Sequence, residues 1–412
     1  MSEKLPKDWV ETELFDICTV ITGKKDANFA TEDGGYLFFT CAFEPLKSDS
    51  YSFEGEVLIL PGNGANVGEV FYYNGKFEAY QRTYIVQKIR INPKFLYYYF
   101  KTNWRKYGVS EQFGSATNYI KIGNFKSFNV AYPPISEQQR IVAKLDHIFS
   151  HLETAKKGLE KIPVLLKQFR QVVLTQAVTG KLTEEWREDL KNITKINVDK
   201  KFKVEHQLID YHELPETWEI TALGNYVECS RGKFTARPRN DSKYFDGEFP
   251  FMQIGDLPRE GGITNKFSKT LNEDGKGVSK SFPENTVVIA IVGATIGNTG
   301  ILEKEMFFPD SLIGINAKTV TSNFFIEFYL RLCKNGLREI SYAGGGQPNI
   351  KLPTITNLEI AIPPIEEQTE IVRRIEALFT KADAIEARYK VLKEKIDNLP
   401  QAVLAQAFRG EL

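Results

Sequence analysis

The sequence predicts α/β (α+β) domains joined by long antiparallel coiled-coil helices, with an internal pseudo-two-fold repeat. The first observation is a duplication, because residues 120–182 align with residues 350–412 at a constant shift of 230 and without a gap. The second is an apolar period typical of coiled coils, which runs through both copies. The third is a weaker match between the segments that precede the copies. Together they predict two related domains that alternate with two similar helical segments.

The helical segments carry the coiled-coil pattern. Apolar or small residues recur at alternating steps of four and three, which indicates a seam rather than an ordinary globular helix. Because one chain contains both partners, we expect an intramolecular pair, with dimerisation of two chains as the alternative. Symmetry favours an antiparallel over a parallel pair, with the two domains at opposite ends. The predicted seam comprises Ile141, Leu145, Ile148, Leu152, Leu159, Ile162, Ile371, Ile375, Leu378, Ile385, Leu392 and Ile396.

Local signals predict where these helices begin. Pairs of prolines at 133–134 and 363–364 stop any earlier helix. Ser136, with Gln139 three residues later, matches a capping box. Glu366 and Glu367 place negative charge in the first turn of the second copy, where the helix dipole favours it.

Other signals predict where the helices end or bend. Gly180 and Gly410 stand where a C-terminal stop is expected. Pro163 and Pro400 lie inside the heptads, and each removes a backbone donor. Since the seam resumes in phase after both, we expect one kinked rod or two consecutive helices in each copy.

Residues 1–135 form the first predicted domain, a mostly antiparallel and irregular α/β block. Trp9 and Leu14 are its expected core anchors, and a helix is predicted from Pro93. Short β-type runs are separated by Gly and Asn turns. These runs are residues 36–40, 56–60, 69–73 and 83–89.

The first block then recurs with different loops. LPETWEITALGNYVE at 214–228 matches LPKDWVETELFDICT at 5–19, and GATIG at 293–297 matches GANVG at 64–68. The predicted divisions are a first globular block at 1–135, a first helical region at 136–182, a linker at 183–213, a second block at 214–365 and a second helical region at 366–412. The linker is expected to be lightly structured, because it is polar and lacks periodicity.

Composition is that of an ordinary globular protein. The chain is 42% hydrophobic, 26% charged and formally neutral. It has no apolar N-terminal run of a signal peptide and no run long enough to span a membrane. Its four cysteines make no CxxC spacing, which is typical of a reducing compartment, so we expect a cytoplasmic protein.

The search for catalytic motifs finds none. A GxxxxGK[ST] loop and a GxSxG elbow are absent. GNGANVG at 62–68 lies between predicted strands and is interpreted as a tight turn rather than a cofactor loop. His147 and His151 share one helix face without the glutamate of a zinc hydrolase, so a solvated face explains them better than a metal site. We therefore predict no catalytic residue and no metal ligand.

Loop residues supply candidates for DNA contact. Residues 1–135 contain 15 Lys and Arg against 15 Asp and Glu, so no basic field marks the whole block. Cations and amides nevertheless gather on Gly-rich loops, where base edges and phosphates could be bound. The candidates are Lys24, Lys25, Arg82, Ser115, Asn118, Lys121, Lys233, Arg237, Arg239, Gln347, Asn349 and Lys351.

Two extended motifs resemble a known family. PPISEQQRIV and AVTGKLTEEWRE lie within 133–188, and PPIEEQTEIV and AQAFRGEL lie within 363–412. They resemble the two conserved helical regions of the specificity subunit of type I restriction–modification systems, and the blocks before them resemble that family's target recognition domains. The resemblance covers nearly the whole chain. The second copy departs from it by ending at Leu412 without an equivalent of TEEWRE.

The resemblance implies a subunit without an active site of its own. Each recognition domain would read one half of a bipartite target on double-stranded DNA. The helical pair would set the spacer between the halves and dock two modification (methyltransferase) subunits. Those partners would use S-adenosylmethionine, and restriction (motor-nuclease) subunits would use ATP and Mg, so no cofactor is expected in this chain.

Two alternatives belong to other functional classes. A DNA adenine methyltransferase with fused recognition domains would require an [ND]PP[YF] motif and a glycine-rich cofactor strand end, and neither is present. A non-catalytic coiled-coil adaptor with sugar- or peptide-binding heads would show weak salt dependence of any DNA binding. It would also fail to co-purify with a methyltransferase.

Overall fold

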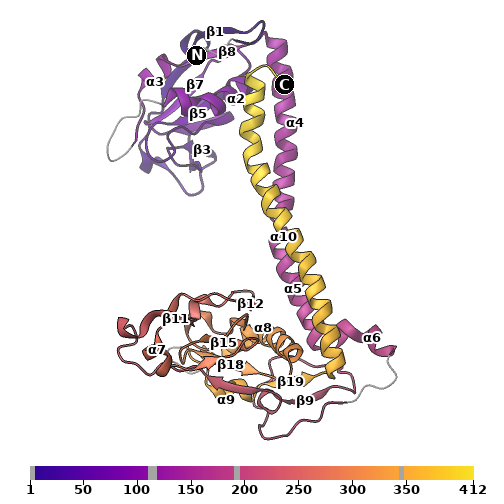
Figure 1. The fold of residues 1–412 in the computed structure, drawn as a ribbon. Helices are drawn as coiled ribbons and strands as arrows, with labels where there is room; N and C mark the ends of the chain where they lie inside the picture. Colours follow the sequence, from indigo (N-terminus) through magenta and orange to yellow (C-terminus); the bar gives the residue numbers. More distant parts are fainter. Residues whose placement is uncertain (1–4, 110–117, 190–194, 343–347) are drawn as a thin grey trace. The chain divides into compact units, whose positions relative to one another are not determined.

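The structure is a computed structural model that describes residues 5–109, 118–189, 195–342 and 348–412. The chain divides into two compact units. Unit 1 contains residues 1–161 and 389–412, and unit 2 contains residues 162–388. Each unit combines one mixed α/β domain with two helical segments (Figure 1). The helical segments in each unit therefore come from both copies of the duplicated sequence.

The domain of unit 1 is built on one mixed sheet. All neighbouring strands are antiparallel except β3 and β6, which are parallel. The predicted strands are confirmed, although β6 begins two residues later than expected. Within the described residues the strand order is β2 (Thr19–Thr22), β7 (Thr83–Gln87), β5 (Phe53–Pro61), β6 (Phe71–Ala79), β3 (Tyr36–Phe39) and β4 (Leu46–Ser48).

Helix α2 (Pro93–Asn103) begins where the sequence predicts. Asn92 caps it by accepting a hydrogen bond from the Phe95 amide at 3.0 Å, and Pro93 supplies a preset φ at the first position. Its apolar face buries Phe95 and Phe100 completely. The domain is completed by α1 (Leu14–Ile17), α3 (Ile122–Lys126) and the antiparallel pair of β1 (Val10–Glu13) and β8 (Asn129–Tyr132).

The domain of unit 2 repeats this plan with its strands divided between two sheets. β10 (Glu228–Arg231), β18 (Leu312–Asn316), β15 (Val287–Ala290) and β16 (Thr299–Leu302) follow the order of β2, β7, β5 and β6. β9 (Glu219–Ala222) pairs with β19 (Glu359–Ile362) as β1 pairs with β8. Helices α8 (Val320–Tyr342) and α9 (Leu352–Thr356) correspond to α2 and α3. In the second sheet, β13 (Lys269–Leu271), β11 (Phe245–Phe251), β17 (Met306–Phe307) and β14 (Ser281–Phe282) follow the order of β4, β3, the end of β6 and the start of β5. Relative to the described residues of the first domain, the additions are β12 (Ile263–Thr264) and α7 (Glu273–Gly277).

In unit 1 the helical pair is α4 (Ile135–Leu159) with the last part of α10 (Ile365–Phe408). Arg140, near the start of α4, donates to the carbonyl of Leu412, whereas Lys156 near its end pairs with Asp397 at 2.9 Å. The partners therefore run in opposite directions (Figure 1). This confirms the antiparallel arrangement within the unit.

In unit 2 the pair is α5 (Ile162–Val178) with the first part of α10. Arg170 bonds Asp383 at 2.6 Å and Glu386 at 2.9 Å, and Arg374 donates to the carbonyl of Leu182 at 2.7 Å. Again the partners run in opposite directions, so the same antiparallel arrangement holds within unit 2.

Two of the predicted seam residues are exposed, which contradicts their place in a buried seam. Ile385 and Leu392 are 49% and 46% exposed, whereas Ala382 beside them is buried. A nearly straight α-helix drifts by about 20° per heptad from a strict 3.5-residue period, so a long apolar row turns away from its partner. The other ten predicted members are buried or half-buried.

The helix starts differ from the predicted capping box. The cap position of α4 is Pro134, without a side-chain hydrogen bond, so Ser136 is not the cap. Instead the buried Gln138 donates to the Pro133 carbonyl at 2.8 Å, and Gln368 of α10 donates to Pro363 at the same distance. This shared bond accounts for the glutamine of the PPxxEQ motif in both copies.

The helix ends follow the prediction. Gly180 and Gly410 adopt left-handed conformations, with φ of 79° and 74°, two residues after α5 and α10 end. Pro163 lies in the first turn of α5, so the first copy forms two consecutive helices. Pro400 lies inside α10, which continues through it.

The segment expected to be a lightly structured linker is packed where it is described. After α6 (Glu184–Glu188), the Phe202 amide donates to Asn225 at 2.7 Å, and His206 forms a parallel bridge with Leu358. Ile209 is buried in the core of unit 2. Residues 195–213 therefore belong to the second domain.

The helices of the described segments include none that combines the length and the apolar character needed to cross a membrane.

Candidate nucleic-acid interface

Loops of unit 1 that are distant in sequence lie against one another. The loop after β2 meets the turn between β6 and β7, where the Lys24 amide donates to the Ala79 carbonyl at 3.2 Å. The Gln81 amide donates in return to the Lys25 carbonyl at 2.9 Å. A side-chain bond from Gln81 to Asp26 at 2.9 Å strengthens the contact. These bonds fix the cationic loop of residues 23–25 beside the turn of residues 80–83.

Two further loops extend the same edge. The Gly62 amide donates to the Arg82 carbonyl at 2.9 Å, and the Gly64 amide donates to the Asn118 carbonyl at 2.8 Å. We call residues 23–25, 62–64, 80–83 and 118–121 the unit 1 loop edge. Backbone hydrogen bonds join its loops into one surface.

The described candidates from the first domain meet on this edge. Lys24, Arg82, Asn118 and Lys121 are exposed there. Lys25 is half-buried, with Nζ 4.2 Å from the centre of the Phe29 ring. Ser115 lies outside the described residues.

Unit 2 repeats the arrangement with its own loops. The Gly232 amide donates to Leu312 at 2.9 Å, the Ile291 amide to Ser311 at 3.1 Å, and the Gly293 amide to Pro348 at 3.2 Å. We call residues 232–239, 291–293, 309–312 and 348–351 the unit 2 loop edge. Its bonds correspond to those of unit 1, so the two domains build the same edge from the same strand ends.

Some candidate side chains on the unit 2 loop edge are exposed, and others already bond to neighbouring residues. Lys233, Asn349 and Lys351 are exposed. Arg239 pairs with Asp310 at 2.8 Å, and Arg237 donates to the Ala236 carbonyl at 2.7 Å. These two guanidinium groups would have to exchange partners to bind DNA. Gln347 lies outside the described residues.

Sequence reasoning overlooked one cation on this edge. Arg231 donates through Nε to the Asp310 carbonyl at 2.6 Å, next to the Arg239 ion pair. Its place directly before Gly232, in SRGK at 230–233, is the signal that could have indicated it.

The glycine-rich segment of unit 1 is a turn, as predicted. Gly64 and Gly68 have φ of 84° and 100°, and the corresponding Gly293 and Gly297 have φ of 65° and 79°. Positive φ at matching positions accounts for these glycines. The turn helps to position the loop edge.

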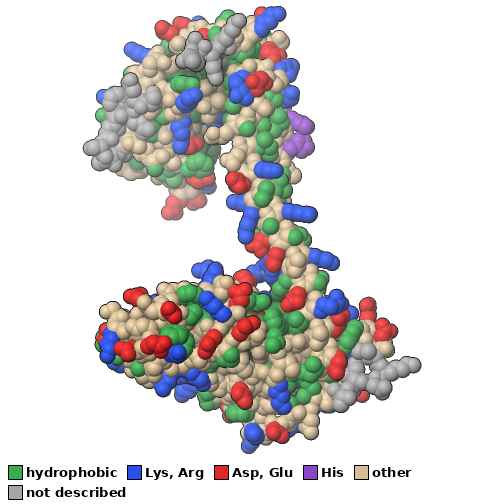
Figure 2. All heavy atoms as spheres, viewed as in Figure 1, with side chains coloured by type: hydrophobic (Ala, Val, Ile, Leu, Met, Phe, Trp, Pro, Cys, Tyr) green, Lys and Arg blue, Asp and Glu red, His purple; other side chains and the backbone are tan. Residues whose placement is uncertain are grey.

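The surface carries mixed charge, as the composition predicts. Figure 2 shows Lys and Arg interspersed with Asp and Glu over each unit, without a large patch of one sign on the face shown. His147 and His151 are exposed on α4, with their Nε2 atoms 3.2 Å apart.

The described residues contain no group of three or more His, Cys, Asp or Glu side chains arranged to hold a metal ion. Burial raises the pKa of the Cys18, Cys229 and Cys333 thiols to about 12, so these thiols stay protonated near neutral pH.

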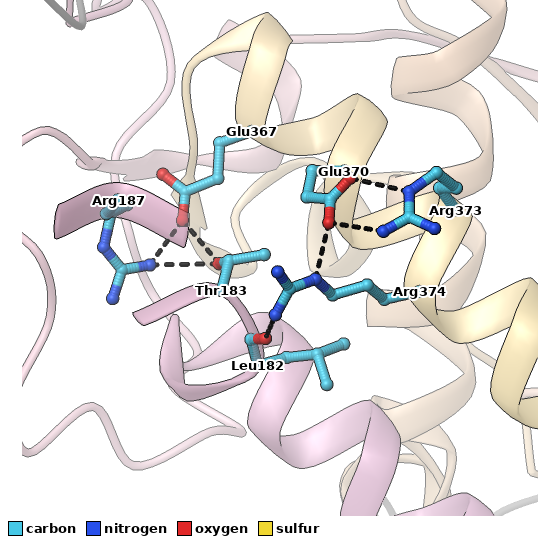
Figure 3. A network of polar contacts seen from close by, with 7 residues as sticks. All are labelled: Leu182, Thr183, Arg187, Glu367, Glu370, Arg373 and Arg374. Atoms are coloured by element: carbon cyan, nitrogen blue, oxygen red, sulfur yellow. Dashed lines mark hydrogen bonds and ion pairs between the residues drawn. The ribbon is translucent and has the colours of Figure 1, made fainter. Parts of the chain in front are cut away.

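A buried network at the start of α10 was also missed by the sequence reasoning, which assigned Glu367 only to the helix dipole. The Glu367 carboxylate is fully buried and accepts bonds from Thr183 at 2.7 Å, from Arg187 and from Trp218 Nε1 at 2.9 Å. Figure 3 shows Thr183 and Arg187 meeting it beside the ion pairs of Glu370. The network ties the TEEWRE segment, the second domain and α10 together within unit 2.

Two α/β domains with matching loop edges, each carried on antiparallel helices, define a duplicated recognition scaffold. The family of the type I restriction modification DNA specificity domain matches residues 6–163 and 215–394. The chain belongs to this family.

Relatives match along almost the whole chain. The EcoDI type I restriction enzyme specificity subunit of Escherichia coli is 32% identical over 99% of this chain and 90% of its own length. The EcoKI specificity subunit of Escherichia coli strain K12 is 27% identical with the same coverage. This chain is accordingly a type I restriction–modification specificity subunit.

Solved structures share the fold. The HsdS subunit from Thermoanaerobacter tengcongensis matches with a TM-score of 0.65 at 16% identity, over 100% of this chain and 99% of its own. A chain solved in work on complex assembly and conformational transition of the type I R-M system matches with a TM-score of 0.69 at 17% identity, over 100% of both chains.

Proposed function

We propose that each domain of this chain reads one half of a bipartite double-stranded DNA target through its loop edge. The observation that carries the proposal is the repetition of one hydrogen-bonded edge with different side chains. A shared backbone scaffold supports the same docking geometry, whereas different exposed cations and amides contact different base edges. Two dissimilar half-targets follow.

The chain contributes recognition and its partners contribute chemistry. Two modification (methyltransferase) subunits dock on the two helical pairs, since both pairs have the same antiparallel arrangement. They flip out and methylate adenine with S-adenosylmethionine. Restriction (motor-nuclease) subunits join them and use ATP and Mg to cleave unmodified DNA. The complex acts in the cytoplasm, where its DNA substrate is.

The helices set the spacer between the two half-targets in this proposal. Much of the phosphate contact comes from the partner subunits, which accounts for the neutral charge of this chain. The absence of an [ND]PP[YF] motif from the sequence gives no support to a fused methyltransferase.

Domain exchange tests the proposal. Residues 1–135 are replaced by the first recognition domain of a relative with a different target, and the full chain is co-expressed with its modification subunits. We expect one half of the methylated sequence to change and the other half to persist, since each loop edge lies within its own domain. Sequencing that detects methylated adenine across the genome measures this.

A control exchanges residues 195–365 instead, and it should change the opposite half. If either exchange alters both halves together, independent reading is wrong.

A further inference from the structure

The turn of residues 80–83 is held firmly within the unit 1 loop edge. The Thr83 amide closes it by donating to the Tyr80 carbonyl at 2.8 Å, and the Gln81 amide is bonded to Lys25. The Arg82 carbonyl receives the Gly62 amide, and a Cβ on Gly62 would lie 2.2 Å from that oxygen. Only glycine allows the two backbones to approach this closely. The backbone around residue 82 is therefore held by hydrogen bonds with the neighbouring loops on both sides, which fixes the direction in which its side chain projects from the turn.

Arg82 differs from the other arginines of the first domain. Arg90 donates to the Asp16 carbonyl at 3.3 Å, and Arg105 pairs with Glu69 at 2.6 Å. The Arg82 side chain is exposed, and no hydrogen bond or ion pair joins its guanidinium to any residue that the structure describes. An ordered turn thus presents a guanidinium group to solvent.

Lysines on the adjoining loops flank this group. Lys24 and Lys121 are exposed on either side of the turn along the loop edge. The lysine ammonium group, on its flexible side chain, binds phosphate as a point charge. The planar guanidinium group of arginine can instead donate two parallel hydrogen bonds to a pair of acceptors in one plane. Guanine presents such a pair, O6 and N7, in the major groove.

We propose that Arg82 reads a guanine in the half-target bound by unit 1, with Lys24 and Lys121 on the flanking phosphates. The inference rests on the proposed function and deepens it by naming the residue and the base. A fixed turn reduces the entropy lost when the side chain binds, which favours a base contact.

The corresponding turn of unit 2 has different chemistry. Ser311 occupies the place of Arg82, because the Ser311 carbonyl accepts a hydrogen bond from the Ile291 amide just as the Arg82 carbonyl accepts one from the Gly62 amide. Asp310 beside it holds Arg239. The same backbone position therefore carries a cation in one unit and a hydroxyl in the other, as two different half-targets require.

Genome-wide mapping of methylated adenine tests the assignment. The full chain is co-expressed with its modification subunits as wild type, Arg82→Ala, Arg82→Gln and Lys24→Ala. We expect Arg82→Ala to lower the preference for guanine at one position of the unit 1 half by about 5- to 150-fold, with the other half unchanged. Arg82→Gln loses the same preference, because glutamine pairs with adenine. Lys24→Ala lowers methylation at all sites equally and keeps the motif.

The outcomes separate the two proposals. A wild-type complex whose methylation shows no bipartite motif refutes the proposed function. A bipartite wild-type motif whose unit 1 half, identified by domain exchange, lacks a G·C pair refutes the Arg82 assignment alone. A guanine preference that survives Arg82→Ala also refutes the Arg82 assignment. A uniform loss of methylation in Arg82→Ala refutes it as well, because that result would place Arg82 on a phosphate. Thermal unfolding of each purified variant verifies folding, and loss of both halves from a folded variant also refutes the assignment.

Discussion

Replacing Glu367 by glutamine should destabilise unit 2 strongly. The fully buried carboxylate accepts bonds from Arg187, Thr183 and Trp218. Glutamine keeps the volume but removes the charge, which leaves a guanidinium that is only 16% exposed without its counter-ion. Removing one partner of a buried ion pair costs about 3–5 kcal/mol. Because the glutamine oxygen still accepts one bond, we expect a loss of about 3 kcal/mol.

The duplication provides a matched control, Glu137→Gln. Glu137 stands at the same repeat position in α4, but its side chain is 38% exposed and pairs with Arg140 at 2.7 Å on the same helix. Exposed pairs of this kind contribute up to about 1 kcal/mol. Removing Glu137 should therefore cost much less than removing Glu367.

Hydrogen exchange of the full chain measures both variants. The opening free energy of residues 214–222 should fall by about 3 kcal/mol in Glu367→Gln and stay unchanged in Glu137→Gln. Denaturant unfolding checks the total loss. Equal losses in the two variants would show that the network does not stabilise unit 2 in the way described.

Three further predictions concern the helices. The half-buried Phe408 ring contacts Trp9, Phe95 and Tyr99, so Phe408→Ala should lower the unfolding free energy of unit 1 by about 2–3 kcal/mol, less than the loss of a fully buried Phe. Denaturant unfolding measures this loss. Bonds from Arg373 and Arg374 lower the pKa of Glu370 from 4.5 to about 2, so the stabilisation by its carboxylate is complete above pH 4.5 and is lost as the pH falls towards 2. In pH-dependent unfolding, the difference in unfolding free energy between the wild type and Glu370→Gln should therefore close over that window. A difference that persists at pH 2 would contradict the cause given. Inserting one heptad into both helical regions adds ~10 Å, about three base pairs, so methylation mapping should show a longer spacer or no activity, and an unchanged spacer with full activity would exclude the ruler.

Local information in the sequence predicted much of the fold. The strands at 36–39 and 83–87 and the helix from Pro93 depend on alternation, proline and a capping residue, which act over a few positions. The glycine stops at 180 and 410 depend on one backbone conformation. The two domains could be compared before the structure was known, because similar sequences fold into similar backbone scaffolds.

The loop edges were predicted as residue types and not as surfaces. Lys24 and Arg82 were named from glycine-rich context, but the backbone bonds that place them together join residues more than fifty positions apart. The same limit explains why Arg239 could not be assigned to Asp310, since no local pattern connects two loops separated by several strands.

By itself, the sequence determined that the chain is duplicated, where its helices start and stop, and which family it belongs to, because periodicity and motifs are written in consecutive residues. Only the tertiary structure decided which halves of the helices pair within each unit, that Ile385 and Leu392 face solvent, and that Glu367 holds Arg187 and Trp218. These features depend on which distant segments exclude water from one another, and burial of this kind has no signature in a single stretch of chain.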